Sequence, residues 1–196
     1  MTKTLDDAGL DLIFREARTY NGYTDQSVTE DQLRTIWDLA KMGPTSANQS
    51  PARIVWCVSD EAKAKLAACA MEANAAKILK APVTAIIGMD YAFYEKLPKL
   101  FPHVDARSWF VGNQPLIDIS AFRNGTLQGA YFIIAARALG LDTGPMSGFN
   151  NAAVDEAFFA GTSVKSNFIC TLGYGDPSTI FGRSPRLEFD EANQVL

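Results

Sequence analysis

The sequence predicts a single domain that mixes helices and strands, with more helices than strands. The length of 196 residues suits one domain, or one protomer of an oligomer. Hydrophobic residues make up 47% of the chain and charged residues 20%, which is the balance of a folded protein. Apolar residues recur at helical spacing in several stretches and form short continuous runs, typical of strands, in others.

The periodic stretches and their boundary residues define the expected elements. Helices are predicted at 5–18, 29–42, 59–79, 119–139 and 151–159, and strands at 53–58, 83–89 and 166–173. The second helix begins at a capping box, because Gln32 follows Thr29 by three positions, and it ends before Gly43 and Pro44. Ser59 is expected to cap the third helix.

Two of these elements carry an expectation about burial, and one further region stands out by its composition. The run RIVWCV at 53–58 is apolar and β-branched, which favours a strand buried on both faces. The helix after Gln128 is apolar on most sides, so we expect it in a core or between subunits. Residues 91–115 break the periodicity and are rich in aromatic side chains, and we interpret them as an excursion that could cover a site. The absence of a repeat or linker predicts one domain over 1–196.

Composition excludes several classes of partner. A net charge of −4 argues against nucleic acid, whose phosphates require a basic face, and favours small molecules. The first residues lack a signal-peptide core, and no run reaches the roughly 18 apolar residues of a membrane span. We therefore expect a cytoplasmic protein without a membrane partner. Cys57, Cys69 and Cys170 form no CxxC pair and are expected to be free thiols that pack inside the fold.

The sequence also excludes common catalytic sites. Its single histidine, His103, and the lack of a GxSxG motif argue against a serine hydrolase. The run LGYGDPS lacks the third glycine of a dinucleotide-binding fingerprint. One histidine without clustered cysteines or carboxylates predicts no metal site.

The residues that remain are small and polar and lie at the edges of elements. The loop GPTSANQSP at 43–51 joins a helix to a strand, and it either cradles a phosphorylated ligand or forms an ordinary turn. Arginines from distant parts of the chain, Arg18, Arg183 and Arg186, would suit a phosphate. Asn74 and Lys77, one helical turn apart, would suit the edge of a polar heterocycle. Each of these residues also suits a solvated surface.

Taken in order, five motifs resemble those of the flavin-dependent nitroreductase family over nearly the whole chain: ARTYNGY, GPTSANQSPAR, NAAK, ALGLDTGPMSGF and RSPR. The stretches LPKLFPHVDARSWF and GYGDPS are similar to the branch that contains malonic semialdehyde reductase, also called 3-hydroxypropionic acid dehydrogenase. The resemblance implies an α+β fold with a mainly antiparallel sheet flanked by helices. It also implies an intertwined homodimer with two FMN sites at the subunit interface.

The resemblance assigns a role to each matching residue. Residues of the N-terminal motif hold the phosphate and part of the ring: Arg18, Thr19 and Asn21. A C-terminal clamp also binds the phosphate: Arg183 and Arg186. Two residues reach the pyrimidine edge: Asn74 and Lys77. One loop serves the flavin of the partner subunit: Pro44, Thr45, Ser46, Ala47 and Asn48. A second loop brings its backbone to flavin N5: Pro145, Met146, Ser147 and Gly148.

Two residues depart from the family pattern. Asn21 stands where many members have lysine or arginine, which removes a positive charge near the flavin. Lys77 is therefore expected to carry more of the stabilisation of the reduced cofactor. Ser147 stands where several members have an acid, and the backbone contact remains available.

The function that the resemblance implies is FMN-dependent oxidation of NADH or NADPH by ping-pong hydride transfer, with no catalytic side chain required. The branch implies reduction of malonic semialdehyde to 3-hydroxypropionate. The carboxylate of that substrate would meet Arg107 and His103, although Arg107 would equally suit a structural pair with a surface acid. A nitroaromatic or quinone reductase of the same family, or a non-catalytic FMN-binding protein, remains an alternative.

Overall fold

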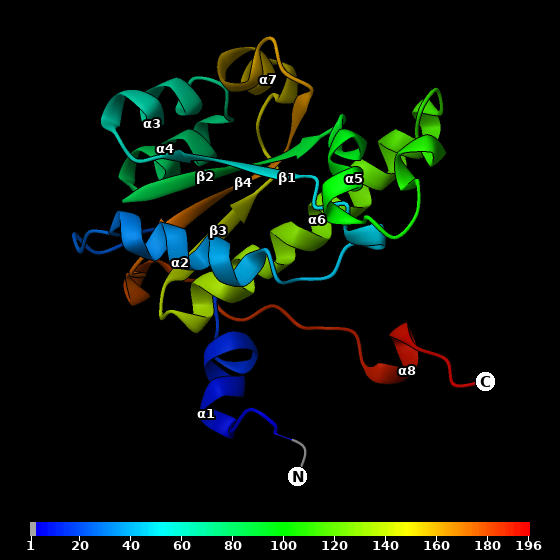
Figure 1. Cartoon of the computed structure of the whole chain (residues 1–196). Coiled ribbons are helices and arrows are strands. Elements are labelled where there is room, and N and C mark those ends of the chain that lie inside the picture. The colour runs from blue at the N-terminus through cyan, green and yellow to red at the C-terminus, as the bar shows by residue number, and fades with distance from the viewer. Residues whose placement is uncertain (1–2) are drawn as a thin grey trace.

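The computed structural model describes residues 3–196, and a four-stranded sheet lies at its centre (Figure 1). The strands are β1 (Ala52–Cys57), β2 (Val83–Asp90), β3 (Asp142–Met146) and β4 (Val164–Gly173). They lie in the order β1-β2-β4-β3, and each neighbouring pair is antiparallel. With helices on both faces, this sheet confirms the α+β class.

Helices cover the sheet on both sides, as Figure 1 shows. The longest helix, α6 (Gln114–Ala138), crosses one face, and α2 (Glu30–Ala40) packs against it. The other face is covered by α3 (Asp60–Ala67), α4 (Glu72–Lys80) and α7 (Asn151–Phe159). Three short helices lie further from the sheet: α1 (Asp7–Leu10), α5 (Leu97–Leu100) and α8 (Phe189–Ala192). The sheet is therefore the middle of three layers.

Two apolar cores result, one on each face of the sheet. Phe132 of α6 and Ile36 of α2 pack with Ile87 and Leu172 on one side. Helices α3, α4 and α7 meet the other side. The central strand β2 is buried along its whole length. By contrast, β1 lies at the edge of the sheet, and its middle residues are only partly buried. Both of its faces are covered as expected, because Ile54 and Trp56 pack against one core, whereas Val55 and Cys57 pack into the other.

The helix expected at 59–79 is interrupted. Ser59 caps α3 as predicted, since its side chain accepts a hydrogen bond from the Ala62 amide. The helix ends at Ala67, and α4 begins at Glu72. Between them the backbone pairs with residues 148–150: the Met71 amide donates to the Gly148 carbonyl at 3.0 Å. This long-range pairing overrides the helical propensity of an alanine-rich segment.

Other boundaries differ where local signals are weak. The capping box of Thr29 and Gln32 is confirmed, and α7 has the predicted bounds. However, α6 begins at Gln114, five residues before the expected start, with Asn113 as its cap. The strand β3 was not predicted, because its sequence DTGPM contains glycine and proline. The helix expected at 5–18 consists of α1 and a π-turn at Asp11–Arg15.

The three cysteines are free thiols. Burial raises the pKa of Cys57 to about 11 and that of Cys170 to about 12, so both are protonated at neutral pH. Cys69 is half-buried at the turn between α3 and α4. Within residues 3–196, no helix combines the length and apolar character needed to cross a membrane.

Candidate functional site

Four arginines converge on one cavity of about 490 Å³, which we call the arginine cavity. Its polar lining consists mainly of Arg18, Thr19, Asn21, Arg137, Arg183 and Arg186. None of the lining residues is acidic, although the chain as a whole carries a net charge of −4. A cavity with four guanidinium groups and no carboxylate favours an anionic ligand, above all a phosphate. The predicted phosphate residues from both ends of the chain are thus brought together.

The N-terminal part of the cavity lies along the free edge of β3. The Tyr20 amide donates to the Thr143 carbonyl at 3.2 Å, and Thr19 forms an isolated parallel β-bridge with Thr143. A Cβ atom on Gly144 would lie 2.7 Å from the Tyr20 carbonyl oxygen and 2.4 Å from Thr171 Oγ1. Only glycine therefore permits this close approach, which sets the position of Arg18 and Thr19.

The C-terminal part of the cavity is tied to the same segment. Asn21 Nδ2 donates to the Thr179 carbonyl at 3.0 Å, and the Gly22 amide donates to Thr179 Oγ1 at 3.1 Å. Asn21 and Gly22 thus tie the segment after Arg18 to the segment around Thr179. The Nδ2 group of Asn21 is therefore engaged in the fold, although the residue also lines the cavity.

Two of the arginines link the ends of the chain directly. Arg183 donates through Nη2 to the Arg15 carbonyl at 2.7 Å and to the Ala17 carbonyl at 3.1 Å. Arg18 donates in the reverse direction, to the Phe181 carbonyl. Because each guanidinium has five N–H donors, these contacts leave others available to a ligand.

Arg137 is a member of the cavity that sequence reasoning missed. It lies in the last turn of α6, and its Nη1 donates to the Ile13 carbonyl at 3.2 Å. From sequence alone it is indistinguishable from a cation that complements the C-terminus of a helix. Its position in the cavity depends on the packing of the N-terminal segment against α6, for which no local signal exists.

Asn74 and the loop after β3 form a second group. Asn74 Nδ2 donates to the Gly148 carbonyl at 3.0 Å, and a Cβ atom on Gly148 would lie 2.5 Å from Asn74 Nδ2. Lys77 is half-buried one turn further along α4. The remaining predicted residues of this loop line an open groove of about 450 Å³ against α6: Pro145, Met146 and Ser147. Asn74 and the 145–148 loop therefore lie in contact, and their predicted roles toward a flavin stay a prediction.

The loop at 43–51 has an unusual backbone. Ala47, Asn48 and Ser50 have φ values of 47°, 50° and 43°, in the left-handed region that non-glycine residues rarely adopt. Buried Asn124 of α6 supports this shape: its Oδ1 accepts from the Ser46 amide at 2.9 Å. Local hydrogen bonds also hold the loop, because the Asn48 amide donates to the Thr45 carbonyl at 3.0 Å. Tertiary and local contacts together therefore maintain this backbone conformation.

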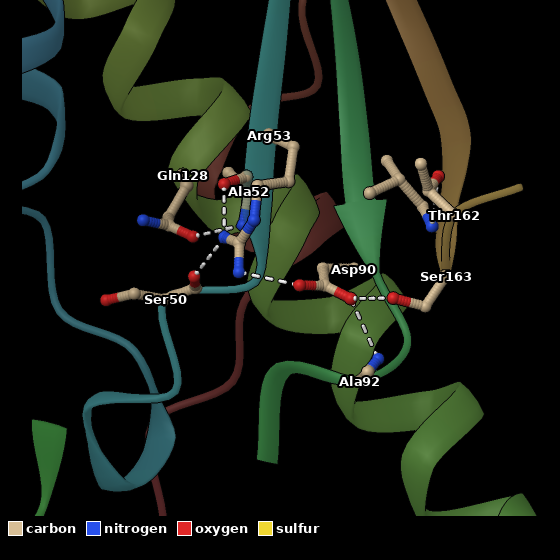
Figure 2. Close-up of polar contacts among 9 residues, drawn as sticks. Ser50, Ala52, Arg53, Asp90, Ala92, Gln128, Thr162 and Ser163 are labelled. Atoms are coloured by element: carbon tan, nitrogen blue, oxygen red, sulfur yellow. Dashed lines mark hydrogen bonds and ion pairs between the residues drawn. The ribbon is translucent and has the colours of Figure 1, made fainter. Parts of the chain in front are cut away.

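An ion pair anchors the end of this loop, as Figure 2 shows. Arg53 Nη2 donates to Asp90 Oδ2 at 2.7 Å, and Arg53 Nη1 donates to the Ser50 carbonyl at 3.0 Å. Asp90 Oδ1 accepts from Ser163 Oγ at 2.6 Å and from the Ala92 amide at 2.8 Å. Both carboxylate oxygens of Asp90 therefore have hydrogen-bond partners, as a side chain that is only 10% exposed requires.

The 43–51 loop and the arginine cavity lie far apart within one chain. Asn124, which binds the loop, precedes Arg137 by 13 residues on α6. At 1.5 Å per residue this is about 20 Å along the helix. One copy of the chain therefore does not bring the two groups of predicted flavin residues together.

The two predicted acceptor-binding residues lie in the 91–115 excursion. Arg107 forms a bidentate ion pair with Glu95, in which Nε and Nη2 lie 2.7 and 2.8 Å from the carboxylate oxygens. Both side chains are partly exposed. The His103 ring packs edge-on against Phe101, with 5.5 Å between the ring centroids. Over the described range 3–196, no group of three or more histidine, cysteine or acidic residues could hold a metal ion.

Comparison with known proteins relates the chain to proteins of similar length. No protein-family model matches it. It is 59% identical over 192 residues to a protein of Burkholderia lata, covering 98% of each chain. It is 60% identical over 195 residues to a protein of Stenotrophomonas maltophilia, covering 100% of each. The names of both place them among the NADH dehydrogenase/NAD(P)H nitroreductases.

Solved structures with the same fold are more distant in sequence. An Exiguobacterium sibiricum protein, described as a nitroreductase in complex with FMN, has a TM-score of 0.86 at 21% identity and covers 100% of both chains. A Staphylococcus epidermidis protein, described as an NAD(P)H:FMN oxidoreductase, has a TM-score of 0.83 at 18% identity, covering 100% of this chain and 98% of its own. At these identities the likeness establishes a shared fold.

Proposed function

The chain belongs to the nitroreductase family, and from this premise we propose that it is an FMN-dependent NAD(P)H oxidoreductase. The observation that carries the proposal is the arginine cavity, which gathers four cations and no acid. The name of the Exiguobacterium protein, which includes FMN, and that of the Staphylococcus protein support the same cofactor. A non-catalytic FMN-binding protein would use the same residues. Bleaching of the flavin colour by NADH or NADPH distinguishes the two.

The described residues fit FMN by their chemistry. The arginine cavity would hold the phosphate, while Asn74 and Lys77 would hold the polar edge of the ring. The backbone at Ser147 and Gly148 would approach N5. Bound FMN supplies hydride transfer in two half-reactions, first with NADH or NADPH and then with an acceptor. The chain's own residues are left to bind, orient and adjust local charge, so no acid or base side chain is assigned.

We further propose a homodimer in which each copy supplies its 43–51 loop to the flavin of the other. The separation of about 20 Å between that loop and the arginine cavity of the same chain supports this arrangement. The exposed face of α6 supports it too, because Ile119, Phe122 and Leu127 are 48%, 57% and 45% exposed. Such a face is typical of an interface between copies.

The proposal is tested on the purified protein by absorbance. We expect a yellow protein, or a colourless one that takes up FMN on titration, with the mass of a dimer by light scattering. NADH or NADPH should bleach the colour, and an acceptor should restore it. A chain that takes up no FMN would contradict the proposal, and a yellow protein that neither nicotinamide bleaches would favour the non-catalytic alternative.

For the acceptor, we propose malonic semialdehyde, with nitroaromatics and quinones as the competing classes. Support comes from the exposed guanidinium of Arg107, whose contacts with Glu95 use Nε and Nη2 and leave Nη1 for a carboxylate. Arg107→Leu is then expected to raise the Michaelis constant for malonic semialdehyde about tenfold, because a charge-assisted contact is lost. Turnover of an uncharged quinone should hardly change.

Glu95→Gln provides the matched control for this substitution. It breaks the same ion pair but keeps the Arg107 guanidinium, so the Michaelis constant for malonic semialdehyde should not rise. If Arg107→Leu and Glu95→Gln impair both acceptors equally, the pair supports the fold of the excursion, and the carboxylated acceptor loses its residue-level support.

Replacing Lys77 with methionine should lower the midpoint potential of bound FMN. A cation beside the ring stabilises negative charge that is present only after reduction, and such a term is worth about 1 to 3 kcal/mol. For a two-electron couple this corresponds to roughly 20 to 60 mV. Lys80→Met, at an exposed position three residues further along α4, is the control and should leave the potential unchanged. Equal potentials in the Lys77 variant and the parent would show that Lys77 does not act on the ring.

A further inference from the structure

Arg137 has donors that the fold does not use. Its Nη1 contacts the Ile13 carbonyl at 3.2 Å, and its Nε is enclosed by protein without any hydrogen-bond partner. The Nη groups are therefore the donors that a ligand in the cavity would meet. In the part of the chain that the structure describes, no carboxylate forms an ion pair with Arg137. A partly buried guanidinium with an unsatisfied donor is unfavourable unless something else compensates it.

The surroundings of Arg137 increase this cost. Burial lowers the pKa of its guanidinium, and the positive charge of Arg183 lowers that pKa further. Cys170 and Asp142 act in the opposite direction. The Asp142 carboxylate, however, accepts the Gly175 amide at 2.9 Å and forms no ion pair with Arg137. The compensating negative charge is therefore absent from the lining of the cavity.

We propose that Arg137 is a further phosphate-binding residue, which acts with Arg18 and Arg183 on the phosphate monoester of a ligand in the arginine cavity. The inference rests on the proposed function in taking FMN as that ligand. A phosphate monoester carries close to two negative charges at neutral pH and three acceptor oxygens, which match the guanidinium donors gathered here. The competing role is structural: Arg137 would only tie the N-terminal segment to α6 through Ile13.

The test compares ligands that differ only in the phosphate. Affinities of FMN and riboflavin are measured by quenching of flavin fluorescence for the parent, Arg137→Gln and Arg137→Lys. Glutamine removes both the charge and the Nη1 contact with the Ile13 carbonyl, whereas lysine keeps a positive charge. Riboflavin, which lacks the phosphate, reports the effect of losing the Ile13 contact alone. Arg34→Gln serves as the control, because Arg34 is an exposed arginine on α2 outside the cavity. A melting curve of each variant with and without inorganic phosphate provides a readout independent of the flavin.

The expected result is specific to the phosphate. Arg137→Gln should weaken FMN binding about tenfold or more and leave riboflavin binding within about twofold, with Arg137→Lys between the two. Equal loss for FMN and riboflavin, or no loss for either, would overturn the assignment. If the parent takes up no FMN, the proposed function fails on its own. The inference about Arg137 then survives only if phosphate raises the melting temperature of the parent and not of Arg137→Gln.

Discussion

Replacing Arg18 and Arg183 together with glutamine is expected to weaken FMN binding by a hundredfold or more. The two side chains line one cavity, although they lie near opposite ends of the sequence. Each charge-assisted contact to a phosphate is worth about 1.5 to 3 kcal/mol, so the pair contributes about 3 to 6 kcal/mol. At about 1.4 kcal/mol per factor of ten, the loss exceeds a hundredfold. Fluorescence titration with FMN measures it.

Riboflavin again separates binding from folding. Both arginines donate through Nη2 to backbone carbonyls, Arg18 to Phe181 and Arg183 to Arg15 and Ala17, and the shorter glutamine side chain does not reach these carbonyls. Because these contacts are exposed, their loss should lower the melting temperature only modestly, and riboflavin should bind almost as before. If riboflavin binding falls as far as FMN binding, the arginines act through the packing of the two chain ends, and the cavity is not a phosphate site.

Asp90→Ala is expected to destabilise the fold by about 3 to 5 kcal/mol, because it removes a buried carboxylate that pairs with Arg53 and accepts two further hydrogen bonds. The substitution leaves Arg53, which is 35% exposed, without its carboxylate. It also removes the acceptor of Ser163 Oγ and of the Ala92 amide. For a chain of this length, thermal unfolding should occur about 6 to 20 °C lower.

An exposed acid provides the comparison. Asp38 pairs with Lys41 on α2 and its side chain is 63% exposed, so Asp38→Ala should cost less than about 1 kcal/mol. If the two substitutions lower the melting temperature equally, the network in Figure 2 is not a strong anchor. Because Arg53 also binds the Ser50 carbonyl, Asp90→Ala should loosen the 43–51 loop, which limited proteolysis detects.

The fold could be predicted from sequence where the signals are local. The capping box at Thr29 and the Ser59 cap involve residues three positions apart, and both are present in the structure. The break after Ala67 could not be predicted, because it depends on pairing with residues 148–150. The strand β3 was missed for the same kind of reason: it forms because β4 and the 19–20 segment lie on either side of it.

The candidate site was predictable to a similar extent. The order of the motifs identified Arg18, Arg183 and Arg186, and the structure brings them into one cavity. The positions of Asn74 and Gly148 were also indicated, and they are in contact. Arg137 could not be found in this way, because it carries no motif and reaches the cavity only through the packing of Ile13 on α6. The contacts that hold the 43–51 loop could not be predicted either, because Asn124 and Asp90 lie on elements that are distant in the sequence.

The length of α6 fixes the distance between the 43–51 loop and the arginine cavity of the same chain. Asn124 and Gln128 on this helix hold the 43–51 loop and the start of β1, whereas Arg137 at its end lines the arginine cavity. Inserting one residue between them would lengthen the helix by about 1.5 Å and rotate its end by about 100°. Asn124 and Arg137 could not then both keep their contacts. Insertions and deletions in this stretch should therefore be far more damaging than substitutions at its exposed positions, because each flavin site of the proposed dimer depends on both features.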